Sequence, residues 1–159
     1  METIILAGGF GTRLQGVVTD VPKPMADING KPFLSYLFDY LLSQNINRVL
    51  LSVGYKYEII KEHFGSKYDN LSIEYIIENK PLGTGGAIRK ALEHTKGKNV
   101  IFLNGDTLFT VDLKGMLDFH LSKNSILTLA LKPMHNVKRY GAVVLENDKI
   151  TGFEEKSFK

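Results

Sequence analysis

Apolar, β-rich runs alternate with segments of helical periodicity along most of the chain, and this alternation constrains the fold more than any other feature of the sequence. The expected strands cover residues 3–7, 48–54, 71–77, 99–103 and 126–131. The expected helices cover residues 33–42, 59–64, 84–94 and 113–121. Strands that alternate with helices in this way are typical of an α/β fold with a doubly wound, mostly parallel sheet. In such a sheet, ligands bind beyond the carboxyl ends of the strands.

The C-terminal part of the chain has a different pattern. Two short β-rich runs, residues 140–146 and 149–155, flank the turn signal Asn147-Asp148, which predicts an antiparallel hairpin. No repeat, low-complexity segment or linker interrupts the chain. We therefore expect a single domain over residues 1–159 with an antiparallel tail, shortened at its C-terminal end because strands are still being added where the sequence stops.

Composition narrows the classes of function. The chain has 159 residues, of which 43% are hydrophobic and 23% are charged, so it can bury one core. It contains no cysteine, which excludes disulfides and thiolate metal sites and fits a reducing cytoplasm. Because no basic segment precedes an apolar run and no apolar run is long enough to span a bilayer, we expect neither export nor membrane insertion. The net charge of +3 is too small to indicate nucleic-acid binding and suits small anionic ligands.

The first expected strand runs directly into the glycine-rich stretch LAGGFGTR, from Leu6 to Arg13. Glycines allow successive backbone N–H groups to converge on an anion such as a phosphate, and an arginine adds a forked cation. The stretch is neither a dinucleotide-binding fingerprint, which needs a small residue where Leu14 stands, nor a P-loop, which needs a lysine at Val17. A plain glycine-rich turn is the alternative to phosphate binding.

Two further residues favour a phosphate site. Lys23 stands between two prolines in PKPM, so a stiff backbone presents its ammonium group. Asp106, in NGDT, follows the apolar strand expected at 99–103, which places it at the same sheet edge as the glycine-rich stretch. A carboxylate at that edge suits Mg²⁺, which takes one or two protein carboxylates together with phosphate oxygens and water. Taken singly, a solvated lysine and a turn aspartate remain the alternatives.

An ordered set of motifs resembles the sugar-1-phosphate nucleotidyltransferases. These motifs are LAGGFGTRL, PKPM, Glu78 followed by PLGTGGA, NGDT, Tyr140-Gly141 and FEEK at 153–156. The resemblance covers essentially the whole chain and implies the Rossmann-like fold of nucleotide-diphospho-sugar transferases. Within the family the likeness is greatest to guanylyltransferases that act on D-glycero-α-D-manno-heptose 1-phosphate, through VTDV at 18–21, NGKPF at 29–33 and SVGYK at 52–56.

The resemblance also implies a reaction and the residues that carry it. Members of the family join a nucleoside triphosphate to a sugar 1-phosphate and release pyrophosphate. The implied catalytic residues are Arg13 and Lys23, which stabilise charge on the leaving pyrophosphate, and Asp106, which holds Mg²⁺. The implied nucleotide-binding residues are Leu6, Ala7, Gly8, Gly9, Gly11, Thr12, Arg13, Lys23, Glu78, Pro81, Leu82, Gly83 and Thr84. The implied sugar-phosphate-binding residues are Gly141, Glu155 and Lys156, with Lys156 drawing the attacking phosphate into line.

Several alternatives stay open from the sequence. GTP is favoured because a carboxylate such as Glu78 can accept from both the N1–H and the N2 amino group of guanine. The sugar is open between the heptose, mannose and others, and a homo-oligomer is left open. Chains of the family continue past the FEEK motif into a second metal ligand and a subunit contact, so a non-catalytic nucleotide-binding module is an alternative to an enzyme of surface polysaccharide synthesis. Leu14 disfavours a dinucleotide-dependent oxidoreductase.

Overall fold

The computed structural model describes residues 1–9, 21–134 and 141–154. They form two compact units, Met1–Gly115 and Met116–Lys159, which are described separately. Within these described ranges, no helix combines the length and apolar character needed to cross a bilayer.

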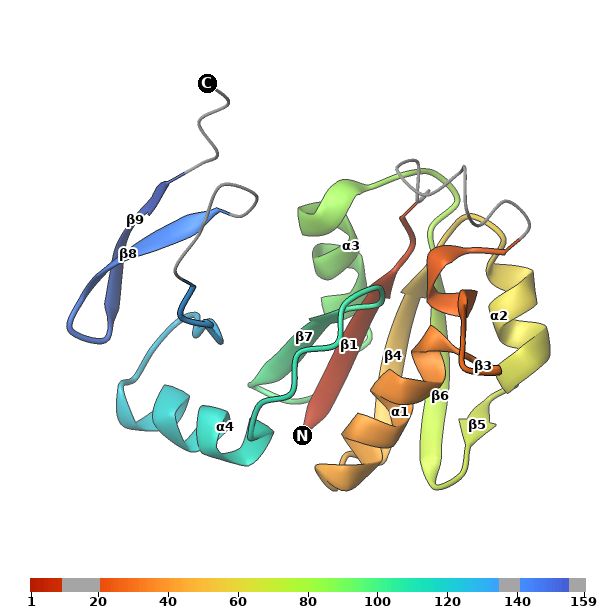
Figure 1. Cartoon of the computed structure of the whole chain (residues 1–159), viewed down its shortest axis with the longest axis horizontal. Coiled ribbons are helices and arrows are strands. Elements are labelled where there is room, and N and C mark those ends of the chain that lie inside the picture. The colour runs from red at the N-terminus through yellow and green to blue at the C-terminus, as the bar shows by residue number, and fades with distance from the viewer. Residues whose placement is uncertain (10–20, 135–140, 155–159) are drawn as a thin grey trace. The chain divides into compact units, whose positions relative to one another are not determined.

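A five-stranded sheet with the order β5-β6-β4-β1-β7 forms the centre of the first unit (Figure 1). Its strands are β1 (Glu2–Ala7), β4 (Arg48–Val53), β5 (Lys67–Tyr68), β6 (Leu71–Ile77) and β7 (Val100–Asn104). The four longer strands are parallel and β5 pairs antiparallel with β6. The predicted doubly wound, mostly parallel sheet is therefore confirmed, with the four longer strands within one residue of their expected bounds.

The order of the strands reverses at β1. The chain passes from β1 to β4 and β6 on one side, and then returns to place β7 on the other side of β1. Two crossovers that leave a strand in opposite directions open a crevice beyond its carboxyl end, which is where α/β sheets bind ligands. The glycine-rich stretch begins at that end of β1.

Helices cover both faces of the sheet because apolar residues occupy both faces of its strands. On one face, Ile5 and Leu51 pack with α1 (Phe33–Ser43) and α2 (Tyr57–Phe64). On the other face, Ile4 and Leu50 pack with α3 (Gly83–Leu92). Strands buried on both sides lose the polar–apolar alternation of half-exposed strands, which explains the nearly continuous apolar runs of the sequence.

Short elements precede α1 that periodicity could not predict. A single 3-10 turn, η2 (Lys23–Met25), leads into the two-residue strands β2 (Asp27–Ile28) and β3 (Lys31–Pro32), which pair antiparallel. The turn between them uses Asn29 and Gly30 at φ values of 53° and 85°. Positive φ at both central residues is the geometry that Asn-Gly favours in tight hairpins.

In the second unit, β8 (Ala142–Glu146) and β9 (Lys149–Glu154) form the predicted antiparallel hairpin. It follows α4 (Leu113–Ser122), which begins in the first unit. The strand expected at 126–131 is wrong: these residues form no regular element, and Ile126 and Leu127 are exposed. In the described part of the chain, β8 and β9 pair only with each other. An apolar run without a neighbouring edge cannot satisfy its backbone groups as a strand.

Candidate active site

A cavity of about 340 Å³ lies at the carboxyl ends of the central strands of the first unit. Its lining comes from the end of β1, η2, the segment between β6 and α3, the start of α3, and the end of β7 with the residues that follow it. The lining residues are Leu6, Ala7, Gly8, Gly9, Lys23, Pro24, Glu78, Pro81, Leu82, Gly83, Thr84, Ala87, Asn104, Gly105 and Asp106.

Gly105 brings the aspartate of NGDT beside the glycine-rich stretch. Leu6 of β1 pairs with Asn104 of β7, and the Gly105 N–H donates to the Leu6 carbonyl oxygen at 2.8 Å. A Cβ at position 105 would lie 2.9 Å from that oxygen, closer than real Cβ atoms come. Glycine is therefore required where the turn crosses β1, and Asp106 follows it into the cavity.

Side chains of α1 and of its C-cap residue anchor the segment that follows Asp106. The Tyr40 hydroxyl donates to the carbonyl oxygen of Val111 at 2.6 Å and accepts from the Val111 N–H at 3.0 Å. The Gln44 side-chain oxygen accepts from the Leu113 N–H at 3.0 Å. These bonds fix the path of the chain away from the cavity.

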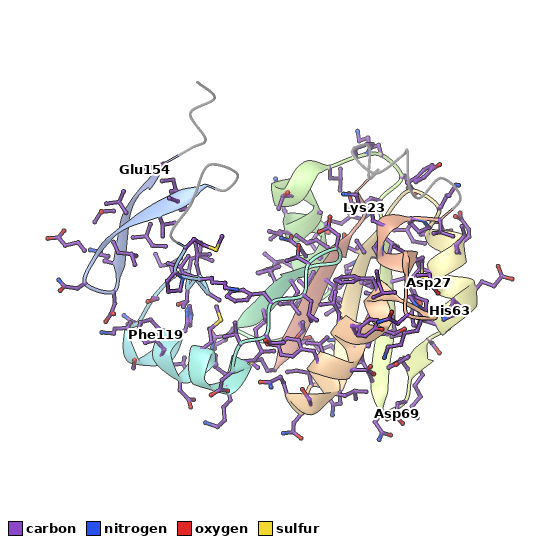
Figure 2. All side chains as sticks on the ribbon, in the orientation of Figure 1. Lys23, Asp27, His63, Asp69, Phe119 and Glu154 are labelled. Carbon is purple, nitrogen blue, oxygen red and sulfur yellow. The ribbon has the colours of Figure 1, made fainter. Side chains whose placement is uncertain are left out.

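Lys23 and Asp106 form a loose ion pair. The Lys23 Nζ lies 3.5 Å from Asp106 Oδ2, and the two side chains are 23% and 50% exposed. Figure 2 shows Lys23 at the sheet edge where the parallel strands end, with Asp69 at the opposite edge. A partly exposed pair at this distance is weakly held, so an anion can take the lysine and a cation can take the carboxylate.

Glu78 is held more firmly than either of these residues. Its Oε1 accepts from the Ser52 hydroxyl at 2.8 Å, and its Oε2 accepts from the Leu82 N–H at 3.4 Å. A Cβ at Gly8 would lie 2.8 Å from Oε1, so the carboxylate occupies the space that a larger residue at position 8 would fill. Three chain segments thus meet at this carboxylate.

The first turn of α3 borders the cavity. Gly83 is the first residue of the helix and has a φ of +66°. The N-cap residue, Leu82, makes no side-chain hydrogen bond to the helix. The N-terminal N–H groups of a helix are unpaired and carry partial positive charge, which favours a neighbouring anion. Lys90, further along α3, donates to the Ile77 carbonyl oxygen and ties the helix to the end of β6.

Asp106 fits the role of a metal ligand that shares the ion with a substrate. Its carboxylate is half exposed in the cavity, and its hydrogen bond from Thr107 is long at 3.3 Å. Across residues 1–9, 21–134 and 141–154, no three acidic or histidine side chains are grouped to hold a metal ion. A single carboxylate at the cavity could hold a divalent cation whose other ligands are substrate and water oxygens.

The structure gathers most of the residues that the motifs indicated. Those around the cavity are Leu6, Ala7, Gly8, Gly9, Lys23, Glu78, Pro81, Leu82, Gly83, Thr84 and Asp106. Gly141 is exposed ahead of β8 in the second unit. The remaining predicted residues, Gly11, Thr12, Arg13, Glu155 and Lys156, lie outside the described residues.

Sequence reasoning gave no role to several residues at the site. Pro24, Ala87, Asn104 and Gly105 all lie inside recognised motifs and line the cavity, but none of them carries a charged group that would mark it as a site residue. The sequence carries a signal for Ser52, because it is the single polar residue in the stretch 49–53 of β4, which is otherwise apolar.

Comparisons with known proteins agree with this geometry. The sequence profile of the nucleotidyl transferase family matches residues 2–157. The D-glycero-α-D-manno-heptose 1-phosphate guanylyltransferase of Aneurinibacillus thermoaerophilus is 53% identical over 99% of this chain and 69% of its own length. The enzyme of the same name from Campylobacter jejuni is 51% identical over 100% of this chain and 70% of its own length.

A solved structure shows that the similarity extends to the fold. HddC from Yersinia pseudotuberculosis, crystallised in complex with GMP-PN, superposes with a TM-score of 0.86 at 41% sequence identity. The match covers 98% of this chain and 69% of that chain.

Proposed function

The chain belongs to the nucleotidyl transferase family and is an enzyme of that kind, and we propose that it transfers guanylate from GTP to a sugar 1-phosphate. The favoured acceptor is D-glycero-α-D-manno-heptose 1-phosphate, the substrate in the names of the two relatives. The product is then a GDP-sugar for capsule or lipopolysaccharide synthesis in the cytoplasm.

The observation that carries the proposal is the convergence of four groups around one cavity. Glycine backbone at the end of β1, the ammonium of Lys23, and the carboxylates of Glu78 and Asp106 all line it. The reaction needs a cradle for phosphates, cations for a leaving pyrophosphate, a metal ligand and a site for the base. Each requirement has a matching group in this one space.

The chemistry requires no nucleophile from the protein. A phosphate oxygen of the sugar 1-phosphate forms a bond to the α-phosphorus of GTP while the bond to the β-phosphate oxygen breaks, and pyrophosphate leaves with the electron pair. Catalysis then depends on positioning and on stabilising the charge that develops on the leaving group. This explains why the cavity is rich in donors and charges and why no serine–histidine pair is needed.

Different groups around the cavity suit different parts of the nucleotide. Gly8 and Gly9 let the triphosphate approach the backbone closely, and Lys23 balances its charge. Glu78 faces the same cavity from the segment before α3 and offers acceptors to the base. By motif, Arg13 adds a second cation at the leaving pyrophosphate.

Asp106 would hold the divalent metal, for which Mg²⁺ is proposed. When bound, the ion neutralises charge on the phosphate oxygens and orients them. Lys23 remains 3.5 Å from the same carboxylate, so the lysine and the metal ligand serve neighbouring phosphate oxygens.

The acceptor side is proposed from motifs alone. Lys156 aligns the attacking phosphate, while Glu155 and the Gly141 backbone hold sugar hydroxyls.

The test is pyrophosphate release measured with GTP, ATP, UTP and CTP against heptose, mannose and glucose 1-phosphates. The proposal expects release with GTP and the heptose phosphate. Release with mannose 1-phosphate instead would keep the guanylyl transfer and change the sugar. Release with another nucleotide only would contradict the guanine assignment.

A further inference from the structure

Ser52 is a buried hydroxyl inside an apolar strand. Its neighbours along β4, Leu51 and Val53, are fully buried, and Ser52 itself is 0% exposed. A buried hydroxyl is unfavourable unless it is hydrogen-bonded. Thr3, on the adjacent strand β1, is equally buried, but its hydroxyl has no partner in the part of the chain that the structure describes. The two positions allow the effect of burial to be separated from the effect of the hydrogen bond.

The hydroxyl of Ser52 is hydrogen-bonded to Glu78, which lines the cavity. It donates to Oε1 of the carboxylate at 2.8 Å, and the Glu78 N–H donates to the Val53 carbonyl oxygen at 2.7 Å. The Leu82 N–H reaches the other oxygen, Oε2, at 3.4 Å. The glutamate is thus fixed at its backbone by β4 and at both carboxylate oxygens by the protein.

This arrangement leaves acceptor capacity on both oxygens. A carboxylate has about four lone-pair sites, and Ser52 and Leu82 use one on each oxygen. Guanine presents two parallel donors, N1–H and the N2 amino group, on one edge. A carboxylate can accept both donors at once only if its plane is aligned with the base. Selectivity for guanine over bases with one donor therefore depends on the orientation of the carboxylate.

We propose that Ser52 is a positioning residue that orients the Glu78 carboxylate to read the two-donor edge of guanine. This inference rests on the proposed guanylyl transfer. Ser52 is fully buried and does not line the cavity, so it acts through Glu78. Without its hydroxyl, the carboxylate keeps only the long bond from Leu82 and can rotate out of line.

The experiment compares GTP with ITP, whose base keeps N1–H but lacks the N2 amino group. Dissociation constants for both nucleotides and kcat and KM with GTP are measured on the wild-type protein and on the Ser52→Ala, Ser52→Thr and Thr3→Val variants. In Ser52→Ala the preference for GTP over ITP should fall on the order of tenfold, the scale of one charge-assisted hydrogen bond. The KM for GTP should rise while kcat changes little.

The controls separate positioning from packing. Ser52→Thr retains a hydroxyl and should restore most of the preference, whereas Thr3→Val removes an equally buried hydroxyl and should leave the preference unchanged. If Ser52→Ala does not fold, Ser52→Cys, with a weaker donor of similar size, should still show a reduced preference.

The outcomes distinguish the two proposals. A wild-type protein that binds ATP or UTP as well as GTP overturns the guanylyl assignment and the role of Ser52 together. A wild-type preference for GTP that survives unchanged in Ser52→Ala or Ser52→Cys overturns the role of Ser52 alone.

Discussion

Asp106 and Lys23 line the cavity and form only a loose ion pair with each other. Their 3.5 Å separation and partial exposure give the pair little weight in folding. Their proposed role is to bind phosphate, in the case of Lys23, and a divalent metal ion, in the case of Asp106. Substitution of either should therefore change activity much more than stability.

Replacing Asp106 with asparagine should lower turnover by about a hundredfold or more, the scale of removing one oriented electrostatic group. Asparagine keeps the size but loses the charge that a divalent cation requires. Turnover as a function of Mg²⁺ concentration, together with the melting temperature, checks this expectation. Asp148→Asn is the matched control, since Asp148 is also an exposed carboxylate paired with a lysine, Lys123. Undiminished turnover in Asp106→Asn would remove Asp106 from the metal site.

Replacing Arg13 with lysine should also lower turnover by about a hundredfold, while the affinity for GTP falls far less. The planar guanidinium can bond two phosphate oxygens at once, whereas an ammonium is a single point charge. Charge on the pyrophosphate grows as it leaves, so an arginine in the proposed role would stabilise the transition state more than bound GTP. Turnover and the dissociation constant, measured on one preparation with Arg89→Lys as control, test this. A collapse of affinity with normal turnover would make Arg13 a binding anchor instead.

Among the elements, β4 carries a residue of the proposed site near one end and a residue that stabilises the sheet at the other. Ser52 lies near its carboxyl end below the cavity, and Arg48 starts the strand at the opposite edge of the sheet. The Arg48 guanidinium donates to Glu2 of β1 and, at 2.7 Å, to Glu74 of β6. Glu2 also accepts from the Lys96 N–H at 2.7 Å, beyond α3. This cluster fastens three strands and a loop at the edge away from the cavity.

Arg48→Met should therefore lower the free energy of unfolding by about 1–2 kcal/mol, since charge-assisted hydrogen bonds are lost from a partly exposed site. Turnover should stay within about twofold of wild type, because the residue lies at the edge opposite the cavity and the strand remains buried. Urea denaturation and pyrophosphate release measure the two quantities. Lys123→Met, which removes a more exposed ion pair, should change stability much less. A large loss of turnover in Arg48→Met would show that the two edges are coupled.

For the whole molecule, the same cluster makes stability depend on acidity. Backbone N–H groups of Gly97 and Lys96 and the Arg48 guanidinium lower the pKa of Glu2 from its ordinary value of 4.5. The hydrogen bond from Arg48 lowers the pKa of Glu74 in the same direction. Because the folded pKa values are depressed, the stabilisation is fully present above pH 4.5 and is lost as the pH falls through the folded values.

The free energy of unfolding should thus decrease on acidification below pH 4.5. In Arg48→Met the decrease should be shallower, since one cause of the lowered pKa values is removed. Urea denaturation between neutral and acidic pH, run on both proteins, checks the slopes. Equal slopes would mean that other carboxylates dominate the acid transition.

The sequence by itself determined the sheet and the edge at which the site lies. Parallel strands share one polarity, so a glycine-rich stretch after the first strand and an aspartate after the strand at 100–104 had to meet at one edge. The sequence also determined the C-terminal hairpin, because Asn147 favours the positive φ of 55° that its turn adopts. These features depend on local chemistry and on strand direction.

Only the tertiary structure decided which side chains meet. The bonds from Ser52 to Glu78 and from Arg48 to Glu2 join residues that are 26 and 46 positions apart. The apolar run at 126–131 fails as a strand for the same reason, since a strand forms only where a neighbouring edge accepts its hydrogen bonds. Periodicity describes one segment at a time, whereas side-chain reach and strand pairing depend on where distant segments are brought together.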